Sequence, residues 1–193
     1  TPTDYYSKLK ENSDVKVVDS SGASVDYAEF NMKNPLFADK SVRKALIMAI
    51  SKKHMKSYLS KADSTTSCFV QKKSLNYSKD AEDYYNEHYG YNKKEAEKLL
   101  KAAGWKKNDK GILEKNGKTF TFTMKTSDAD NVKKSIQAIQ ADWKDIGVNM
   151  KIEAKGWSYV NQDVEKGKFA CARMGLEWSE PFLLLDIFMS RSN

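Results

Sequence analysis

Apolar residues recur at the spacing of an α-helix in three segments of the chain, and each segment carries a start or stop signal. Asp39 and Asn92 are good N-cap residues, and Glu95 follows Asn92 at the capping-box position. Gly147 stands after the third segment, residues 129–146, as a helix stop. The apolar positions are Val42, Ala45, Leu46, Ala49 and Ile50; Ala96, Leu99, Leu100 and Ala103; and Val132, Ile136, Ile139, Trp143 and Ile146. The pattern predicts three amphipathic helices that bury one face each.

Other segments show the alternation or the short apolar runs that are typical of strands. The predicted strands are residues 15–19, 25–30, 148–154 and 169–174. A hairpin is predicted around Asn116-Gly117, because this dipeptide favours a two-residue turn between strands. In its second arm, KTFTFTM, the residues Phe120, Phe122 and Met124 face one side.

Shorter helices and one long loop complete the predicted order of elements. The expected short helices are residues 4–12, the stretch SKKHMKSYLS from Ser51, residues 157–166 and residues 181–189. Residues 61–91 are polar and tyrosine-rich without a clear period, so we predict a long loop there. The succession of strands and helices predicts an α/β fold with a mixed sheet flanked by helices.

The bulk composition narrows the function classes. The chain has 193 residues, of which 40% are hydrophobic and 31% charged, which predicts a globular domain with a core and no membrane-spanning segment. The net charge is +7, but the lysines come as scattered pairs among acids, a pattern typical of solvated helix faces rather than of a phosphate-binding stripe. Nucleic acid is therefore not an expected partner. A chain that starts at Thr1-Pro2 is expected to be a piece of a longer protein.

The residues that carry catalysis in known enzymes form no recognisable constellation here. His54 and His88 are the only histidines, and there is no Gly-rich phosphate loop, zinc-protease motif or nucleophile elbow. We therefore predict that the protein is not an enzyme and needs no cofactor or metal. Cys68 and Cys171 suit no metal motif; they either form a disulfide in an exported protein or are two small buried hydrophobic residues.

One combination of residues resembles a known family. The combination consists of Tyr27, Phe30, Asn31, Pro35, Phe37, Asp39, Val42, Arg43, Ala45, Leu46, Ala49 and Ile50. This order is similar to the signature of the extracellular solute-binding proteins of peptide-type ABC importers, the family 5 that also includes nickel binders. The stretches YGYNKKEAEKLLKAAGW, IGVNMKIEAKGW and FACARMGLEWSEPFLLLDIFMSRSN are similar to later blocks of that family. The resemblance thus extends over almost the whole chain.

The resemblance implies a fold, a function and partners. Residues 24–193 would be the distal, C-terminal ligand-binding lobe of a type II periplasmic-binding-protein-like fold, truncated before its return to the base lobe, and residues 1–23 a remnant of the hinge and base lobe. The implied function is capture of oligopeptides by closure of two lobes. The implied partners are the peptide and an ABC permease, and the protein would be a monomer, lipid-anchored outside the cytoplasmic membrane or periplasmic. The alternatives are a peptide-sensing or surface-interaction receptor of the same fold, and a binder of nickel chelates or other solutes.

The resemblance also assigns ligand contacts to three residues of the strand and helix regions. Tyr27 and Glu29 match family positions that touch the peptide, although a half-buried strand tyrosine and a solvent-exposed glutamate are the alternative. Trp157 matches an aromatic residue that lines a side-chain pocket; it could equally anchor the short helix on the core.

Charged ends of a peptide need charged partners, and two residues near the C-terminal end of the chain match such partners. Arg173 matches an arginine that faces the ligand's C-terminus in some members, since its planar fork suits a carboxylate. A structural ion pair with a neighbouring acid is the alternative. Glu177 would bind the ligand's ammonium, with Trp178 beside it, or would lie in solvent. The segment between Gly175 and Pro181 is shorter than in the family, which weakens this match.

Overall fold

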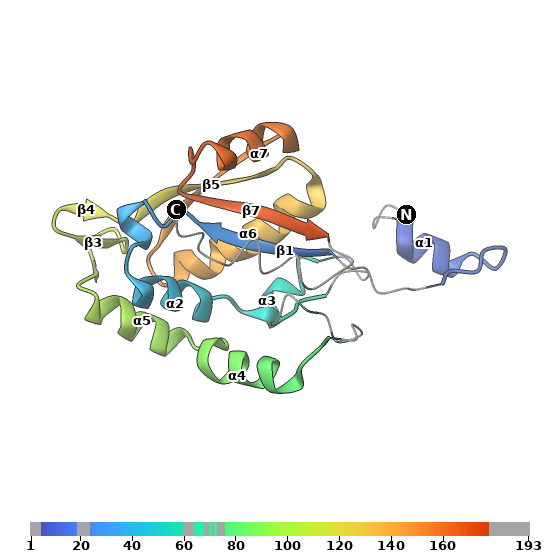
Figure 1. Cartoon of the computed structure of the whole chain (residues 1–193), viewed down its shortest axis with the longest axis horizontal. Helices are drawn as coiled ribbons and strands as arrows, with labels where there is room; N and C mark the ends of the chain where they lie inside the picture. The colour runs from blue at the N-terminus through green and yellow to red at the C-terminus, as the bar shows by residue number, and fades with distance from the viewer. Residues whose placement is uncertain are drawn as a thin grey trace.

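A four-stranded mixed sheet organises the chain in a computed structural model, which describes residues 5–18, 24–59, 64–67, 70, 72 and 76–177 (Figure 1). Its strands, in sheet order, are β1 (Ser24–Phe30), β7 (Cys171–Glu177), β5 (Thr121–Ser127) and β6 (Asn149–Lys155). β1 runs antiparallel to β7, whereas β5 is parallel to both β7 and β6. This confirms the predicted mixed sheet and the strands predicted at 25–30 and 148–154. The strand predicted at 169–174 exists but begins two residues later, at Cys171.

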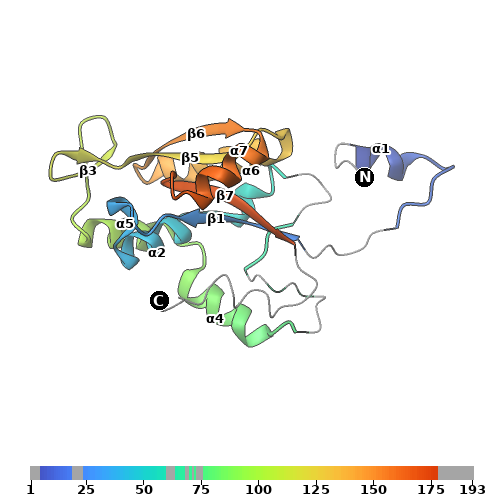
Figure 2. The same cartoon turned by 45° about the horizontal axis from the view of Figure 1, so that its top comes forward.

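Helices cover both faces of this sheet. They are α2 (Lys40–Met48), α5 (Lys93–Ala102) and α6 (Asp130–Asp145) on the core side, and α7 (Trp157–Glu165) on the other. α6 packs on β5 and β6, α2 packs on α5, and α7 packs on β5 (Figure 2). Met124 and Cys171 pair across β5 and β7 with 0% exposure and face the main core, so Lys125 and Ala172 face α7.

The three predicted amphipathic helices are confirmed, with their caps. The Asp39 carboxylate accepts a hydrogen bond from the Ser41 amide at 2.8 Å, and the Asn92 side chain accepts one from the Glu95 amide at 3.0 Å. Gly147 has φ of +92°, a conformation that disfavours any side chain, and it ends the third helix. The buried residues include Val42 and Leu46, Ala96 and Leu100, and Val132, Ile136, Ile139, Trp143 and Ile146.

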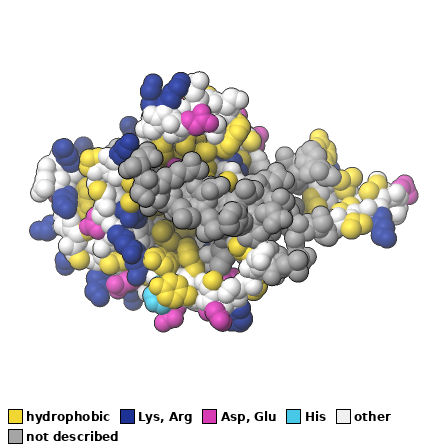
Figure 3. Space-filling view, in the orientation of Figure 1, with side chains coloured by type: hydrophobic (Ala, Val, Ile, Leu, Met, Phe, Trp, Pro, Cys, Tyr) yellow, Lys and Arg dark blue, Asp and Glu magenta, His cyan; other side chains and the backbone are white. Residues whose placement is uncertain are grey.

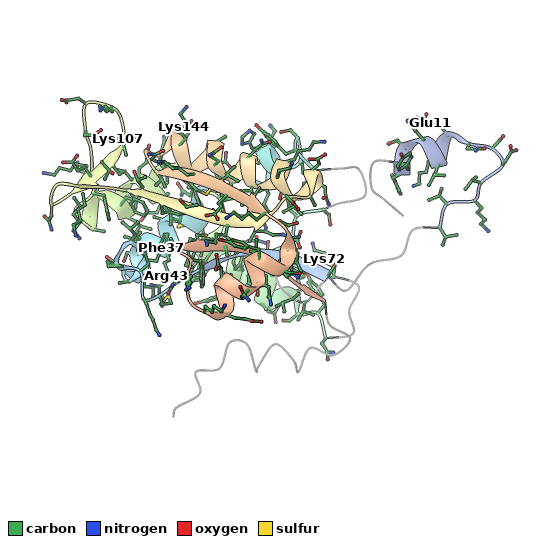
Figure 4. All side chains as sticks on the ribbon, turned by 90° about the horizontal axis from the view of Figure 1, so that it is seen from above. Glu11, Phe37, Arg43, Lys72, Lys107 and Lys144 are labelled. Atoms are coloured by element: carbon green, nitrogen blue, oxygen red, sulfur yellow. The ribbon has the colours of Figure 1, made fainter. Side chains whose placement is uncertain are left out.

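The segment between β1 and α2 is held by polar side chains that bind backbone groups. The Asn31 Nδ2 donates to the carbonyls of Gly167 and Phe169, at 3.2 and 2.8 Å. The Arg43 Nη1 donates to the carbonyls of Phe37 and Ala38, at 2.6 and 3.0 Å, and Figure 4 shows Phe37 and Arg43 side by side at the start of α2. Phe37, in the short 3-10 helix Pro35–Phe37, has 0% exposure. The residues that carry the family resemblance therefore fix the backbone between two elements.

The predicted hairpin is only partly right. Its turn is confirmed, because Asn116 and Gly117 have φ of 53° and 73°, as in a type I′ turn. The turn joins β3 (Leu113–Lys115) to β4 (Lys118–Thr119), and β2 (Lys106–Lys107) completes a small three-stranded sheet. KTFTFTM does not continue as one arm: after Thr119 the chain crosses into the main sheet as β5. There Phe120, Phe122 and Met124 are buried on one side, as predicted.

Three other predictions were wrong. No strand forms over the described residues 15–18, where Val15 and Val18 are exposed. Residues 61–91 are not all loop: α4 (Lys79–Tyr89) begins at the Ser78 cap, and its only helical period is carried by tyrosines. The helix from Ser51 is a single turn, α3 (Lys52–Met55), shorter than expected. The helix predicted at 181–189 and the turn at 20–22 lie outside the described residues.

α1 (Tyr6–Glu11) confirms the short helix predicted near the start of the chain. It lies apart from the other labelled elements in two views (Figures 1 and 2), and none of its residues is buried. The end of β7 and the start of β1 are on the side of the sheet that faces α1, whereas β3 and β4 lie at the opposite side (Figure 1).

Candidate functional site

A shallow pocket of about 210 Å³ lies at the carboxyl end of β7, the side of parallel strands where α/β proteins bind ligands. It is lined by Ser24, Asp26, Trp157, Arg173, Gly175 and Leu176. The pairing of the two strands explains this grouping, because Ser24 lies opposite Glu177 and Asp26 opposite Gly175. Trp157 joins them from α7, which starts directly after β6.

Arg173 is the charged centre of this pocket. Its Nη2 forms an ion pair with Oδ2 of Asp26, so the structural ion pair that was considered for Arg173 is present. The Arg173 side chain is 14% exposed and the Asp26 side chain 57%. The Arg173 Nε is buried and has no hydrogen-bond partner in the part of the chain that the structure describes. The guanidinium is thus neutralised, but its donors are not all satisfied.

Gly175 makes room for this pair. A Cβ at position 175 would lie 3.1 Å from Oδ1 of Asp26 and 3.7 Å from Nη1 of Arg173. Any side chain here would therefore press on the aspartate where it meets the guanidinium. Neither Asp26 nor Gly175 was predicted as a site residue. Alternation along the strand puts Asp26 on the opposite face from Val25 and Tyr27, but its pairing with Gly175 depends on the register of β1 and β7, which the sequence alone does not fix.

Tyr27 and Glu29 lie on the other face of β1. They pair with Met174 and Ala172 of β7 and do not line the pocket. Both are half-buried, so Glu29 is not the solvent-exposed residue considered as an alternative. Burial raises the pKa of the Tyr27 hydroxyl, and the nearby Glu29 charge raises it further; burial also raises the pKa of the Glu29 carboxyl.

Trp157 is the first residue of α7 and is 41% exposed. Its ring belongs to the pocket wall and not to the main core. Further along the same helix, the Asp163 carboxylate pairs with the Lys125 ammonium, and this lysine holds the pKa of Asp163 below its ordinary value. The pair ties α7 to β5 and so positions Trp157 at the strand end.

The remaining predicted site residues are placed only in part. Glu177 is the last residue of β7 and pairs with Ser24, so its backbone lies next to the pocket. Trp178 lies outside the described residues. The structure thus brings Trp157 and Arg173 together, with the Glu177 backbone beside them. Tyr27 and Glu29 lie on the strand face opposite to Arg173, on the side of α7. Cys171 is a buried free thiol, and burial raises its pKa far above the ordinary value; Cys68 lies outside the described residues.

A second pocket, of about 340 Å³, lies against α4. Its lining is Ser67, Val70, Asn76, Ser78, Ala81, Tyr84, Tyr85 and Tyr89. In Figure 3 hydrophobic side chains gather over this helix.

No group of three or more His, Cys, Asp or Glu side chains within the described ranges could hold a metal ion. Nor does any helix in those ranges have the length and apolar character needed to cross a membrane.

Comparison with known proteins extends these observations. A family model for the bacterial extracellular solute-binding proteins, family 5 (middle), matches residues 1–191. The oligopeptide-binding protein AppA of Bacillus subtilis is 34% identical over 180 residues, which are 92% of this chain and 32% of AppA. This chain therefore spans about a third of the length of that relative.

Solved structures of solute-binding proteins have the same fold as this chain. The structure of Bacillus subtilis AppA in complex with a nonapeptide matches with a TM-score of 0.79 and 31% identity, over 93% of this chain and 36% of that one. NikZ of Campylobacter jejuni, solved with Ni(L-His), matches with a TM-score of 0.71 and 24% identity, over 97% and 37% of the two chains. The second likeness concerns the fold alone.

Proposed function

Because the chain belongs to the bacterial extracellular solute-binding proteins of family 5, we propose that it is one lobe of the substrate-binding component of an ABC importer and that this component captures oligopeptides. The observation that carries the proposal is the 34% identity to an oligopeptide-binding protein over 92% of the chain. The mechanism would be closure of two lobes over the ligand, and the ligand would favour the closed state through contacts that only this state offers.

The position of α1 supports the proposed division of the chain. Residues 24–193 would form the ligand-binding lobe, and residues 1–23 would lead to the other lobe. α1 supports this division, because it has no buried residue and lies beyond the strand end that carries the pocket (Figure 1). The pocket would then face the second lobe.

The pocket suggests how the lobe would hold a peptide. Arg173 would bind the ligand's carboxylate through its planar fork, and Trp157 would form the wall of a side-chain pocket. Glu177, with Trp178 beside it, would bind the ammonium end. Tyr27 and Glu29 lie on the strand face opposite to Arg173, on the side of α7, so they would contact only a part of the peptide that lies on this side of the sheet.

The wider setting of the protein follows the family. We propose a monomer without catalytic activity that works outside the cytoplasmic membrane, lipid-anchored or in the periplasm, and delivers its ligand to an ABC permease. The receptor alternative and the nickel-chelate alternative predict different ligands. The NikZ likeness supports the nickel reading only through the fold, so peptide is the first choice.

Native mass spectrometry of the full-length protein tests the ligand. Co-purified oligopeptide would support the proposal, and a nickel chelate in its place would contradict it. Calorimetry of the 193-residue chain with a peptide mixture tests the two-lobe mechanism, because one lobe offers only part of the contacts. We expect binding weaker than about 1 μM from this chain alone, and submicromolar binding would contradict the half-site.

A further inference from the structure

We propose that Asp26 is an exchangeable internal counter-ion of Arg173, which gives way to the carboxylate of a bound ligand. In this role Asp26 sets the preference of the pocket for ligands with a free carboxylate. The inference rests on the proposed function only for the identity of the ligand. The exchange itself rests on the geometry of the pair.

The two partners differ in how firmly they are held. The Arg173 side chain is 14% exposed, so most of it is withdrawn from water. A guanidinium in this position needs an anionic acceptor, because an unpaired buried charge is costly. The Asp26 side chain is 57% exposed and can turn into solvent at little cost. Of the two, only the carboxylate is free to leave, and another carboxylate has to replace it.

The guanidinium also has an unused donor next to the one that Asp26 occupies. Its Nε–H and Nη2–H groups form one edge that can hold both oxygens of a carboxylate. Asp26 binds at Nη2, whereas Nε is buried without a partner among the described residues. A ligand carboxylate that bound both nitrogens would satisfy the orphaned donor. It would also take the position that Asp26 holds, so the two acceptors compete.

The surroundings leave space for this exchange. Asp26 and Arg173 both line the 210 Å³ pocket, and Gly175 between them has no side chain to block the approach. Trp157, which also lines the pocket, offers an apolar surface for the part of the ligand next to its carboxylate. A cationic or neutral ligand end would gain nothing from Arg173 and would leave the Asp26 pair in place.

The exchange can be followed on Arg173 itself. The sequence has three arginines, Arg43, Arg173 and Arg191, so the arginine Nε–H signals in a 15N-correlated NMR spectrum are few, and Arg173→Lys identifies the relevant one. The first probe is sodium acetate, with sodium chloride as the ionic-strength control. We expect Asp26→Asn to move the Arg173 signal at an acetate concentration about fivefold lower than the unsubstituted chain requires.

The matched control is Asp109→Asn, which removes the same charge from the exposed turn between β2 and β3, at the opposite side of the sheet (Figure 1). It should behave like the unsubstituted chain. Equal acetate midpoints in the three proteins would overturn the inference, because Asp26 would then not compete for the guanidinium.

A second arm separates this inference from the proposed function. Trialanine and trialanine amide differ only in the free carboxylate, and Asp26→Asn should tighten binding of the first and not of the second. If acetate shows the exchange but trialanine and its amide behave alike, the counter-ion role stands and peptide-end recognition by Arg173 fails. If trialanine moves the Arg173 signal equally in all three proteins, the counter-ion role fails and the peptide site stands.

Discussion

The segment from Asn31 to Arg43 and the pocket at the end of β7 use polar side chains in opposite ways. In the first, Asn31, Asp39 and Arg43 each bind backbone groups, with distances between 2.6 and 3.2 Å. In the second, Arg173 is paired with one exposed carboxylate and keeps a buried donor without a partner in the described ranges. In the first arrangement the polar groups find their partners on the backbone, whereas in the second one donor stays open among the described residues.

The difference shows where the most specific sequence signal lies. Residues whose side chains bind backbone groups specify a local backbone conformation. The same residues are therefore expected, in the same order, in other proteins that share this conformation. Residues that bind a ligand must leave donors and acceptors open, which costs stability and gives no recurrent local pattern. The residues between Asn31 and Arg43 are therefore easier to recognise in the sequence than the residues that line the pocket.

The largest expected contrast is between two aromatic residues, one from each region. Phe37 has 0% exposure and contacts the rings of Phe30 and Phe122, at centroid distances of 4.9 and 5.0 Å. Phe37→Ala should lower the free energy of unfolding by about 3–5 kcal/mol, measured by urea denaturation. Trp157→Ala, at the 41%-exposed pocket wall, should cost less than about 1 kcal/mol and should weaken ligand binding instead. Similar losses of stability in both variants would remove the contrast.

A smaller contrast is expected between two glycines. Gly147 has φ of +92°, and a Cβ there would lie 2.9 Å from the Gly111 carbonyl oxygen, which is backbone and cannot move aside. Gly147→Ala should therefore cost at least about 1–2 kcal/mol in urea denaturation. Gly156→Ala is the control for the substitution itself, because a Cβ there meets nothing within 4 Å.

Gly175→Ala belongs to the pocket. Its new methyl group would meet the exposed Asp26 carboxylate at 3.1 Å, and this side chain can turn away. We expect a change in stability below about 0.5 kcal/mol, together with a shift of the Arg173 Nε–H signal as the ion pair loosens. A loss as large as that of Gly147→Ala would show that this end of β7 is as rigid as the core.

The sequence predicted the fold where apolar periodicity and caps agree. α2, α5 and α6 were found with their stripes and stops, because each had a cap or glycine at its boundary in addition to its period. α4 was missed because its repeating residues are tyrosines at half-exposed positions, which resemble a polar loop. The path of Phe120 into the main sheet was missed as well. A pairing partner for β5 some thirty residues away cannot be seen from local alternation.

The candidate site was predictable only to the level of single residues. Trp157 and Arg173 were recognised from a resemblance, and their meeting at one pocket required the sheet order and register. Asp26 was not recognised, because its role depends on its position diagonal to Arg173 across β1 and β7, and sequence alone does not fix that register. Pairing between strands far apart in the chain is thus the information that the sequence lacked.

The smallest expected effect concerns the pH dependence of Glu29, on the strand face that does not line the pocket. Burial raises the pKa of this carboxyl in the folded protein. Between the ordinary value and the raised one, the folded state binds more protons than the unfolded state, so stability falls as pH rises through this window. Below the window the carboxyl is neutral in both states and does not change the free energy of unfolding. Above the window the carboxylate is ionised in both states, and the full cost of burying its charge lowers the stability of the folded state. Because the side chain is half-exposed, solvent reduces the effect.

Glu29→Gln should remove this component. The variant should unfold at a slightly higher temperature than the unsubstituted chain at about pH 8 and at the same temperature at about pH 4. Glu11→Gln, at the exposed end of α1, removes the same charge without a burial change and is the control. Equal melting temperatures of Glu29→Gln and the control at both pH values would mean that Glu29 is as well solvated as a surface residue.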